Sequence, residues 1–421
     1  MKFPRPKLIS FRDEIEEVPN TGYLTHALYY HPAKFIPQVV RYCLNNYCKE
    51  GGVILDPFAG SGTVGLEASI NGYKAYLIDI NPLLDYFYTI KIPKFSLNEW
   101  SKIYRKISNK LEEIIMPSSK PKGNKIKLDI ETLEYWYPTD LLNYFVSVWN
   151  KFHSLPSKKQ NEKIIKSTIA LIMFKTSKKY SYAEHSMPKL FTSKRKRKYI
   201  NSLKRGKILF NKIKREALKE LNKINRSITQ TLSSYKVKGT EYFSGVDAYE
   251  FNYKKIDPVN CIITSPPYLQ AQEYIRTFKL EMMWLGYSKN KIRDFARKEI
   301  PFRPNMGIIH GNYIDKLRDK NKRKDLLEIF DSYFWFTIKS IERACKALKR
   351  SGKLCVFVGN PVMNRVNVEI WKVVYEYFTT NLNYKFISIF KDRIVQRKLF
   401  KGRNNINPSG MKSEFLLVLK K

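Results

Sequence analysis

The stretch that most constrains the fold of this chain is residues 53–79. A short apolar run opens it, two glycines follow at Gly60 and Gly62, and a segment with helical character comes next. A second apolar run at residues 75–79 ends on Asp79. A strand, a glycine turn, a helix and a second strand in this order form half of a doubly wound sheet. The sequence therefore predicts an α/β fold with a ligand site at the carboxyl ends of its strands.

The α/β pattern stops near residue 91 and returns near residue 241. Between these points the chain is helical, polar and basic, and one expected helical face comprises Leu203, Phe210, Ile213, Ala217, Leu221 and Ile224. Later helices are expected at 324–350 and 371–378, and later strands at 259–264, 353–359, 384–390 and 414–419. We therefore expect a Rossmann-like domain of residues 1–90 and 241–421, interrupted at residues 91–240 by a mainly helical, basic insertion.

The charge of the chain indicates a polyanionic partner. Lys and Arg number 77 against 38 Asp and Glu, which gives a formal net charge of +39. Contacts of Lys and Arg with phosphates release counterions, so such a chain can bind nucleic acid in a salt-dependent way. A Lys-rich bias of an AT-rich genome is the alternative explanation. Segment 287–323 is one candidate for reading nucleic-acid bases, and the basic insertion is the other. The basic run of the insertion could grip phosphates, and it comprises Lys194, Arg195, Lys196, Arg197 and Lys198.

Composition also bounds the compartment. No apolar run approaches the roughly 20 residues of a membrane span, and no apolar leader follows Met1. The five cysteines and five histidines are scattered without zinc spacing. We therefore expect a cytoplasmic protein with reduced thiols, no bound metal and no membrane partner.

Two motifs carry the chemistry. Residues 56–63 (DPFAGSGT) place two glycines at a strand-to-helix turn, where a ligand can approach free backbone N–H groups. Asp79 ends the next strand, where an acid can accept hydrogen bonds from both hydroxyls of a ribose. No Gly-Lys-Ser/Thr follows these glycines, as a phosphate P-loop would need, and we expect an adenosine-type nucleoside as the ligand. The second motif, SPPY, offers the Ser265 hydroxyl and the Pro266 carbonyl to an amine, and the Tyr268 ring to a stacked base.

Together these motifs resemble motifs I and IV of the S-adenosylmethionine-dependent DNA amino-methyltransferases, which alkylate exocyclic nitrogens. Residues 31–38 (HPAKFIPQ) are similar to the N-terminal cofactor segment of that family, motif X. The resemblance implies a class I methyltransferase sheet and S-adenosylmethionine as cofactor. The catalytic residues that it implies are Ser265, Pro266, Pro267 and Tyr268. The cofactor-binding residues that it implies are Lys34, Phe35, Asp56, Phe58, Gly60, Gly62, Thr63, Asp79 and Asp247.

The resemblance implies a site-specific DNA methyltransferase of a restriction-modification system, with a restriction endonuclease reading the same site as partner. A Ser-first tetrapeptide is commoner in cytosine-N4 enzymes, and the target base has to be flipped out of the duplex. Adenine-N6 methylation stays open. Asp or Asn is the commoner first residue of the tetrapeptide in adenine-N6 enzymes, but a Ser in that place does not settle which base is methylated. Methylation of a guanine amino group in RNA and nucleic-acid binding without catalysis are further alternatives. Methylation at cytosine C5 is excluded because no Cys follows a Pro.

Overall fold

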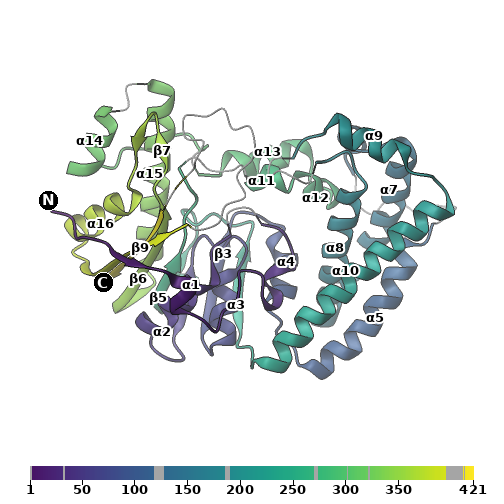
Figure 1. The fold of residues 1–421 in the computed structure, drawn as a ribbon, viewed down its shortest axis with the longest axis horizontal. Coiled ribbons are helices and arrows are strands. Elements are labelled where there is room, and N and C mark those ends of the chain that lie inside the picture. The colour runs from purple at the N-terminus through teal and green to yellow at the C-terminus, as the bar shows by residue number, and fades with distance from the viewer. Residues whose placement is uncertain are drawn as a thin grey trace.

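The computed structural model describes the chain except for residues 1, 32–33, 118–127, 185–189, 270–273, 301, 321–322, 395–410 and 412 (Figure 1). The strands are β1 (Lys7–Ile9), β2 (Val53–Asp56), β3 (Lys74–Asp79), β4 (Thr240–Ser244), β5 (Val259–Thr264), β6 (Leu348–Gly359), β7 (Val362–Met363), β8 (Val366–Asn367), β9 (Lys385–Arg393) and β10 (Ser413–Lys420). The α-helices are α1 (Phe11–Glu14), α2 (Pro37–Tyr47), α3 (Thr63–Ile70), α4 (Leu84–Lys91), α5 (Leu97–Ile115), α6 (Ile130–Glu134), α7 (Thr139–His153), α8 (Gln160–Lys179), α9 (Lys194–Ser202), α10 (Lys207–Ser234), α11 (Tyr274–Thr277), α12 (Lys279–Trp284), α13 (Lys289–Arg297), α14 (Asn312–Lys320), α15 (Lys324–Ala344) and α16 (Ile370–Asn381). Short 3₁₀ helices lie at η1 (Leu24–Ala27) and η2 (Tyr253–Lys255).

An 8-stranded sheet in the order β1-β9-β10-β6-β5-β2-β3-β4 forms the centre of the molecule. The strands from β6 to β4 are parallel, and β10 runs antiparallel between β6 and β9. This mostly parallel sheet confirms the predicted Rossmann-like α/β class. Since β5, β2, β3 and β4 are parallel neighbours, their carboxyl ends meet at one edge of the sheet, where a ligand site is expected.

Apolar side chains cover both faces of the sheet, because successive residues of a buried strand point to opposite sides. Ile54 of β2 packs into the core that contains α2 and α3, whereas Leu55 packs into the core that contains α15 and α16. The five cysteines are free thiols, and Cys261 is buried within β5 as the sequence predicts.

A group of long helices, α5, α7, α8 and α10, lies between β3 and β4 in the chain and stands together at one side of the sheet (Figure 1). We call this group the helical body. Its apolar side chains belong to the same core as α2 and α3, and α8 packs against α4. Because the core is shared, the division of the chain into residues 1–90 with 241–421 and an insertion at 91–240 stays a prediction.

Helix α10 shows how the insertion folds. Its buried residues follow the predicted face from Ile213 through Ala217 and Leu221 to Ile224, and it packs against α5 and α8. The predicted start of this face is wrong. Leu203 lies before the helix as the C-cap of α9, and Phe210 is only half-buried.

Several expected element boundaries also differ from the structure. The helix predicted at 324–350 ends at Ala344, and β6 begins at Leu348 instead of Lys353. Leu348 pairs with Val259 of β5 in the sheet instead of extending the helix. The Val259 N–H donates to the Ala347 carbonyl at 2.8 Å, at the start of the β5–β6 ladder. The helical lead-in expected over 24–50 is a 3₁₀ turn followed by α2, whose first residue is Pro37, a favoured helix start.

Candidate active site

A pocket with about 920 Å³ of empty space, part of it open to solvent, lies at the carboxyl ends of β2, β3 and β5. The two motifs that the sequence singles out both reach it. The predicted site residues that line the pocket are Phe35, Asp56, Phe58, Gly60, Asp79, Asp247, Ser265 and Pro267. Segments far apart in the sequence therefore face one cavity.

Two side chains of α4 contact the glycine loop after β2 and hold its backbone in place. Gly60 and Gly62 have φ values of +47° and +73°, which glycine adopts without steric cost. A Cβ on Gly62 would come within 2.6 Å of the Tyr88 ring, and the Tyr88 hydroxyl donates to the Gly60 carbonyl at 2.8 Å. The buried Lys91 ammonium donates to the Ser61 carbonyl at 2.6 Å. The loop thus has one defined shape before any ligand binds.

Gly62 and Thr63 join this loop to the start of α3. Gly62 is the N-cap of α3, and Thr63 is the first residue of that buried helix. The Thr63 and Ser61 hydroxyls lie 3.0 Å apart. Both predicted residues therefore contribute to the shape of the loop, and a direct contact with a cofactor stays a prediction for them.

Two acids end the central strands and face the pocket. Asp79 accepts hydrogen bonds from the Gly60 N–H at 2.7 Å and from the Asn81 N–H at 2.9 Å. Asp56 accepts from the Thr264 hydroxyl at 2.7 Å, which ties the end of β2 to the end of β5. Burial raises the pKa of Asp79 to about 6 and that of Asp56 to about 7, because water is withdrawn from the charged forms.

A third acid, Asp247, follows β4 and carries an arginine partner. The Arg303 guanidinium donates to Asp247 Oδ2 at 2.5 Å and lies 3.9 Å from the centroid of the Phe336 ring. The Arg303 side chain is 9% exposed and lines the pocket. Segment 287–323, expected to read DNA, therefore contributes at least this arginine to the cavity.

The N-terminal cofactor segment is divided between two roles. Phe35 lines the pocket and stacks on Phe357 with ring centroids 5.4 Å apart. The Lys34 ammonium instead donates to the carbonyls of Thr21 and His26, and burial lowers its pKa to about 8. A role for Lys34 toward a cofactor stays a prediction.

The SPPY tetrapeptide after β5 is also divided. Ser265 and Pro267 line the pocket, whereas Pro266 and Tyr268 lie outside its lining. The Tyr268 hydroxyl donates to Glu414 Oε1 of β10 at 2.5 Å, and its ring lies beside Gly359 at the end of β6. In this arrangement Tyr268 packs against the sheet next to the pocket.

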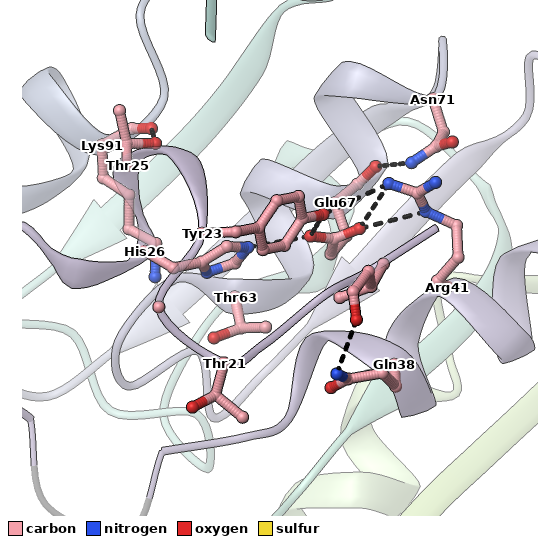
Figure 2. A network of polar contacts seen from close by, with 12 residues as sticks. Thr21, Tyr23, Thr25, His26, Gln38, Arg41, Thr63, Glu67, Asn71 and Lys91 are labelled. Atoms are coloured by element: carbon pink, nitrogen blue, oxygen red, sulfur yellow. Dashed lines mark hydrogen bonds and ion pairs between the residues drawn. The ribbon is translucent and has the colours of Figure 1, made fainter. Parts of the chain in front are cut away.

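A buried polar network behind the glycine loop joins α3 to the N-terminal segment (Figure 2). Glu67 of α3 accepts from Arg41 Nε at 3.1 Å and from Arg41 Nη2 at 2.9 Å, and its Oε1 is also bonded by the Tyr23 hydroxyl. His26 Nε2 lies 2.8 Å from Glu67 Oε1. Burial lowers the pKa of His26 well below its usual value, which favours the neutral ring. We call these residues the Glu67 network.

The basic run at 194–198 forms the first turns of α9, far from the lining of the pocket. Arg195 pairs with Glu184 at 3.1 Å, and Lys196 donates to the Lys179 carbonyl at 2.8 Å. The Arg197 guanidinium lies 4.5 Å from the centroid of the Tyr182 ring. Lys194 and Lys198 are exposed. Contact of this run with phosphates stays a prediction.

Sequence reasoning gave no individual cofactor or catalytic role to several residues that line the pocket, namely His31, Asn81, Tyr274, Ile275, Lys298, Glu299, Ile300 and Arg303. His31 lies in the predicted cofactor segment 31–38, and the last four lie in segment 287–323. Most of them lie on loops and short helices whose position depends on tertiary packing. The one usable signal is chain order, because residues 274–275 and 298–303 follow the SPPY motif.

In the described part of the chain, no helix combines the length and the apolar character needed to cross a membrane. The described His, Cys, Asp and Glu residues also include no group of three or more placed to hold a metal ion.

Comparison with known proteins agrees with this geometry. Residues 12–90 match the model of a family described as DNA methylase. The chain is 25% identical over 342 residues to the Type II methyltransferase M.BsoBI of Geobacillus stearothermophilus, covering 77% of this chain and 60% of the relative. It is 26% identical over 315 residues to the Type II methyltransferase M.AvaI of Nostoc sp., covering 71% of this chain and 61% of the relative.

A shorter match, 34% identical over 88 residues, relates the chain to the Type II methyltransferase M.MjaII of Methanocaldococcus jannaschii. It covers 21% of this chain and 17% of that relative. The chain thus spans about three fifths of the length of M.BsoBI and M.AvaI. The chain is similar to DNA methylases, and the similarity includes the glycine loop after β2.

Proposed function

We propose that the chain is an S-adenosylmethionine-dependent DNA methyltransferase that modifies N4 of cytosine within a restriction-modification system. One observation carries the proposal. The glycine loop after β2 and Ser265 after β5 line the same pocket at the carboxyl edge of a Rossmann-like sheet. The likeness to Type II methyltransferases supports the reaction class and the link to a restriction endonuclease that reads the same site.

The acceptor groups and apolar surface of the pocket suit S-adenosylmethionine. Asp79 accepts two backbone N–H groups, and a carboxylate has about four acceptor positions, so it can also take the hydroxyls of a ribose. Phe58 and Ile300 offer apolar surface to an adenine ring. The bound cofactor would supply an electrophilic methyl group on a sulfonium.

Ser265 and Pro266 would act on the target base. The exocyclic amine of cytosine is a poor nucleophile, because its lone pair is delocalised into the ring. Hydrogen bonds accepted by the Ser265 hydroxyl and the Pro266 carbonyl favour a pyramidal nitrogen and aim its lone pair at the methyl group. As the N–CH3 bond forms, the S–CH3 bond of the sulfonium would break and leave a neutral thioether, and the nitrogen would release one proton to solvent. Positioning of this kind supplies most of the acceleration in such a transfer. The Tyr268 ring would stack on the everted base.

Mass spectrometry of nucleosides tests the function. DNA is incubated with the protein and a methyl-labelled donor, digested and separated. We expect labelled N4-methylcytosine. Labelled N6-methyladenine would move the assignment to adenine, and DNA without label would overturn the proposal.

The site assignment has its own test, the double variant Ser265→Ala with Tyr268→Ala. We expect loss of labelled product. The affinities for DNA and cofactor should stay within about threefold of those of the unmodified protein, which corresponds to about 0.7 kcal/mol in binding free energy. Retained turnover would remove these residues from the assigned roles.

A further inference from the structure

A second group of cations lies beside the pocket, on the three short helices that follow the SPPY motif. Arg276 of α11, Lys279 of α12, and Lys289 and Arg293 of α13 form this group, which we call the α11–α13 cluster. The three helices pack against one another. Arg276, Lys289 and Arg293 are exposed, and Lys279 is half-buried among them.

The cations of the cluster are close enough to repel one another. Burial and then the positive charges of Lys289, Arg276 and Arg293 lower the pKa of Lys279, and Asp129 opposes them only weakly. Gathering like charges in this way costs free energy in the free protein. An anion bound among them would offset that cost.

The cluster borders the pocket directly. Tyr274 and Ile275 line the cavity, and Arg276 is the next residue of the same helix. At the other end of the cluster, α13 leads into Lys298, which also lines the cavity. In Figure 1 the three helices lie between the sheet and the helical body. A nucleotide that enters the pocket therefore brings its neighbouring phosphates close to these cations.

The α9 run compares poorly as a phosphate site. The cations of the α11–α13 cluster lie on helices that contain or adjoin Tyr274, Ile275 and Lys298, which line the pocket, whereas neither α9 nor its neighbours in the chain do so.

We propose that the α11–α13 cluster binds the phosphate backbone of duplex DNA beside the flipped nucleotide. This proposal rests on the proposed function, because it needs DNA as the substrate. Arg276, Lys289 and Arg293 contact phosphates and fix the register of the duplex over the pocket, without reading bases.

The test is the salt dependence of DNA binding by the triple variant Arg276→Gln, Lys289→Gln and Arg293→Gln. Each lost phosphate contact reduces the slope of log K against log salt by about 0.9. We therefore expect the slope to become shallower by about 2 to 3. The matched control is Lys102→Gln, Arg105→Gln and Lys106→Gln, which removes the same charge from the exposed side of α5. The control slope should change by less than about 0.5.

Wild-type methylation is measured in the same samples, so that the two proposals fail separately. If the wild type methylates DNA and the triple variant has the same slope as the wild type, phosphate binding by the α11–α13 cluster is overturned and the proposed methyltransferase function stands. If the triple variant has a shallower slope but the wild type methylates no base, phosphate binding by the α11–α13 cluster is supported and the proposed methyltransferase function is overturned. Wild-type protein that does not bind DNA would overturn both. Unchanged cofactor affinity of the triple variant shows that it is folded.

Discussion

At the residue scale, Asp79 holds the glycine loop and faces the pocket at once. Replacing it in Asp79→Ala removes a charged acceptor worth about 1.5–3 kcal/mol per hydrogen bond. We expect calorimetry to show S-adenosylmethionine binding weakened by about 10- to 100-fold. Asp319→Ala on α14, an exposed acid, is the matched control and should leave the affinity unchanged. Equal affinities of Asp79→Ala and the wild type would remove Asp79 from the cofactor site.

Asp56 predicts a pH effect on stability. Burial raises its pKa to about 7, so the folded protein holds a proton here that the unfolded chain releases near pH 4. This contribution is complete at low pH and is lost as pH rises toward 7. Between about pH 4 and 7, the unfolding free energy of the wild type should fall relative to Asp56→Asn by up to about 1.4 kcal/mol per pH unit. Urea titrations of both proteins measure this, and parallel pH profiles would contradict the assignment.

Individual residues were predictable from the sequence where a local rule applies. Gly60 and Gly62 follow from the turn between a strand and a helix, and Asp79 follows from the end of the next strand. Arg303 could not be found in this way, because its partner Asp247 and its neighbour Phe336 come from other elements.

At the scale of elements, the Glu67 network fastens α3 and α2 to the N-terminal segment. Glu67→Ala would leave the buried Arg41 guanidinium with only the exposed Glu17 carboxylate, 3.7 Å away, and loss of a buried partner typically costs about 3–5 kcal/mol. We expect urea unfolding to show a loss of that size. Glu113→Ala, the same substitution in the exposed pair with Lys110, should cost almost nothing. Similar losses in the two variants would contradict the importance of the network.

Element boundaries show where sequence patterns stop being sufficient. The strand at 259–264 was predicted with its observed bounds, because an apolar run has no competing pattern there. The end of α15 was misplaced, since residues 345–350 suit a helix by composition. Their backbone groups are instead needed by β5, and that pairing is not visible in the local sequence.

At the scale of the whole molecule, a buried ion pair joins the helical body to the pocket side. Glu281 of α12 accepts from Lys178 of α8 and from the Tyr29 hydroxyl, each at 2.8 Å. Lys178→Met leaves the Glu281 carboxylate buried without its cation, and we expect a loss of about 3–5 kcal/mol in urea unfolding. The double variant with Glu281→Met should recover part of that loss, because no buried charge remains. Additive losses in this double-mutant cycle would show that the pair is not coupled.

The helical character of the insertion could be predicted, but its attachment could not. Periodicity identifies the buried face of α10, whereas packing of α8 on α4 depends on residues distant in the chain. The sequence also indicated that the two motifs meet, because parallel strands end at one edge. It did not indicate that Tyr268 would bond Glu414.

The place of β10 in the sheet has a consequence for how the protein is assembled during translation. This strand follows all the other described strands in the chain, yet it lies in the interior between β6 and β9. Until the ribosome releases it, β9 and β1 have no link to the rest of the sheet, and Tyr268 lacks its hydrogen-bond acceptor. A nascent chain halted shortly before residue 413 would expose two unpaired strand edges, which are aggregation-prone and readily recognised by chaperones and proteases.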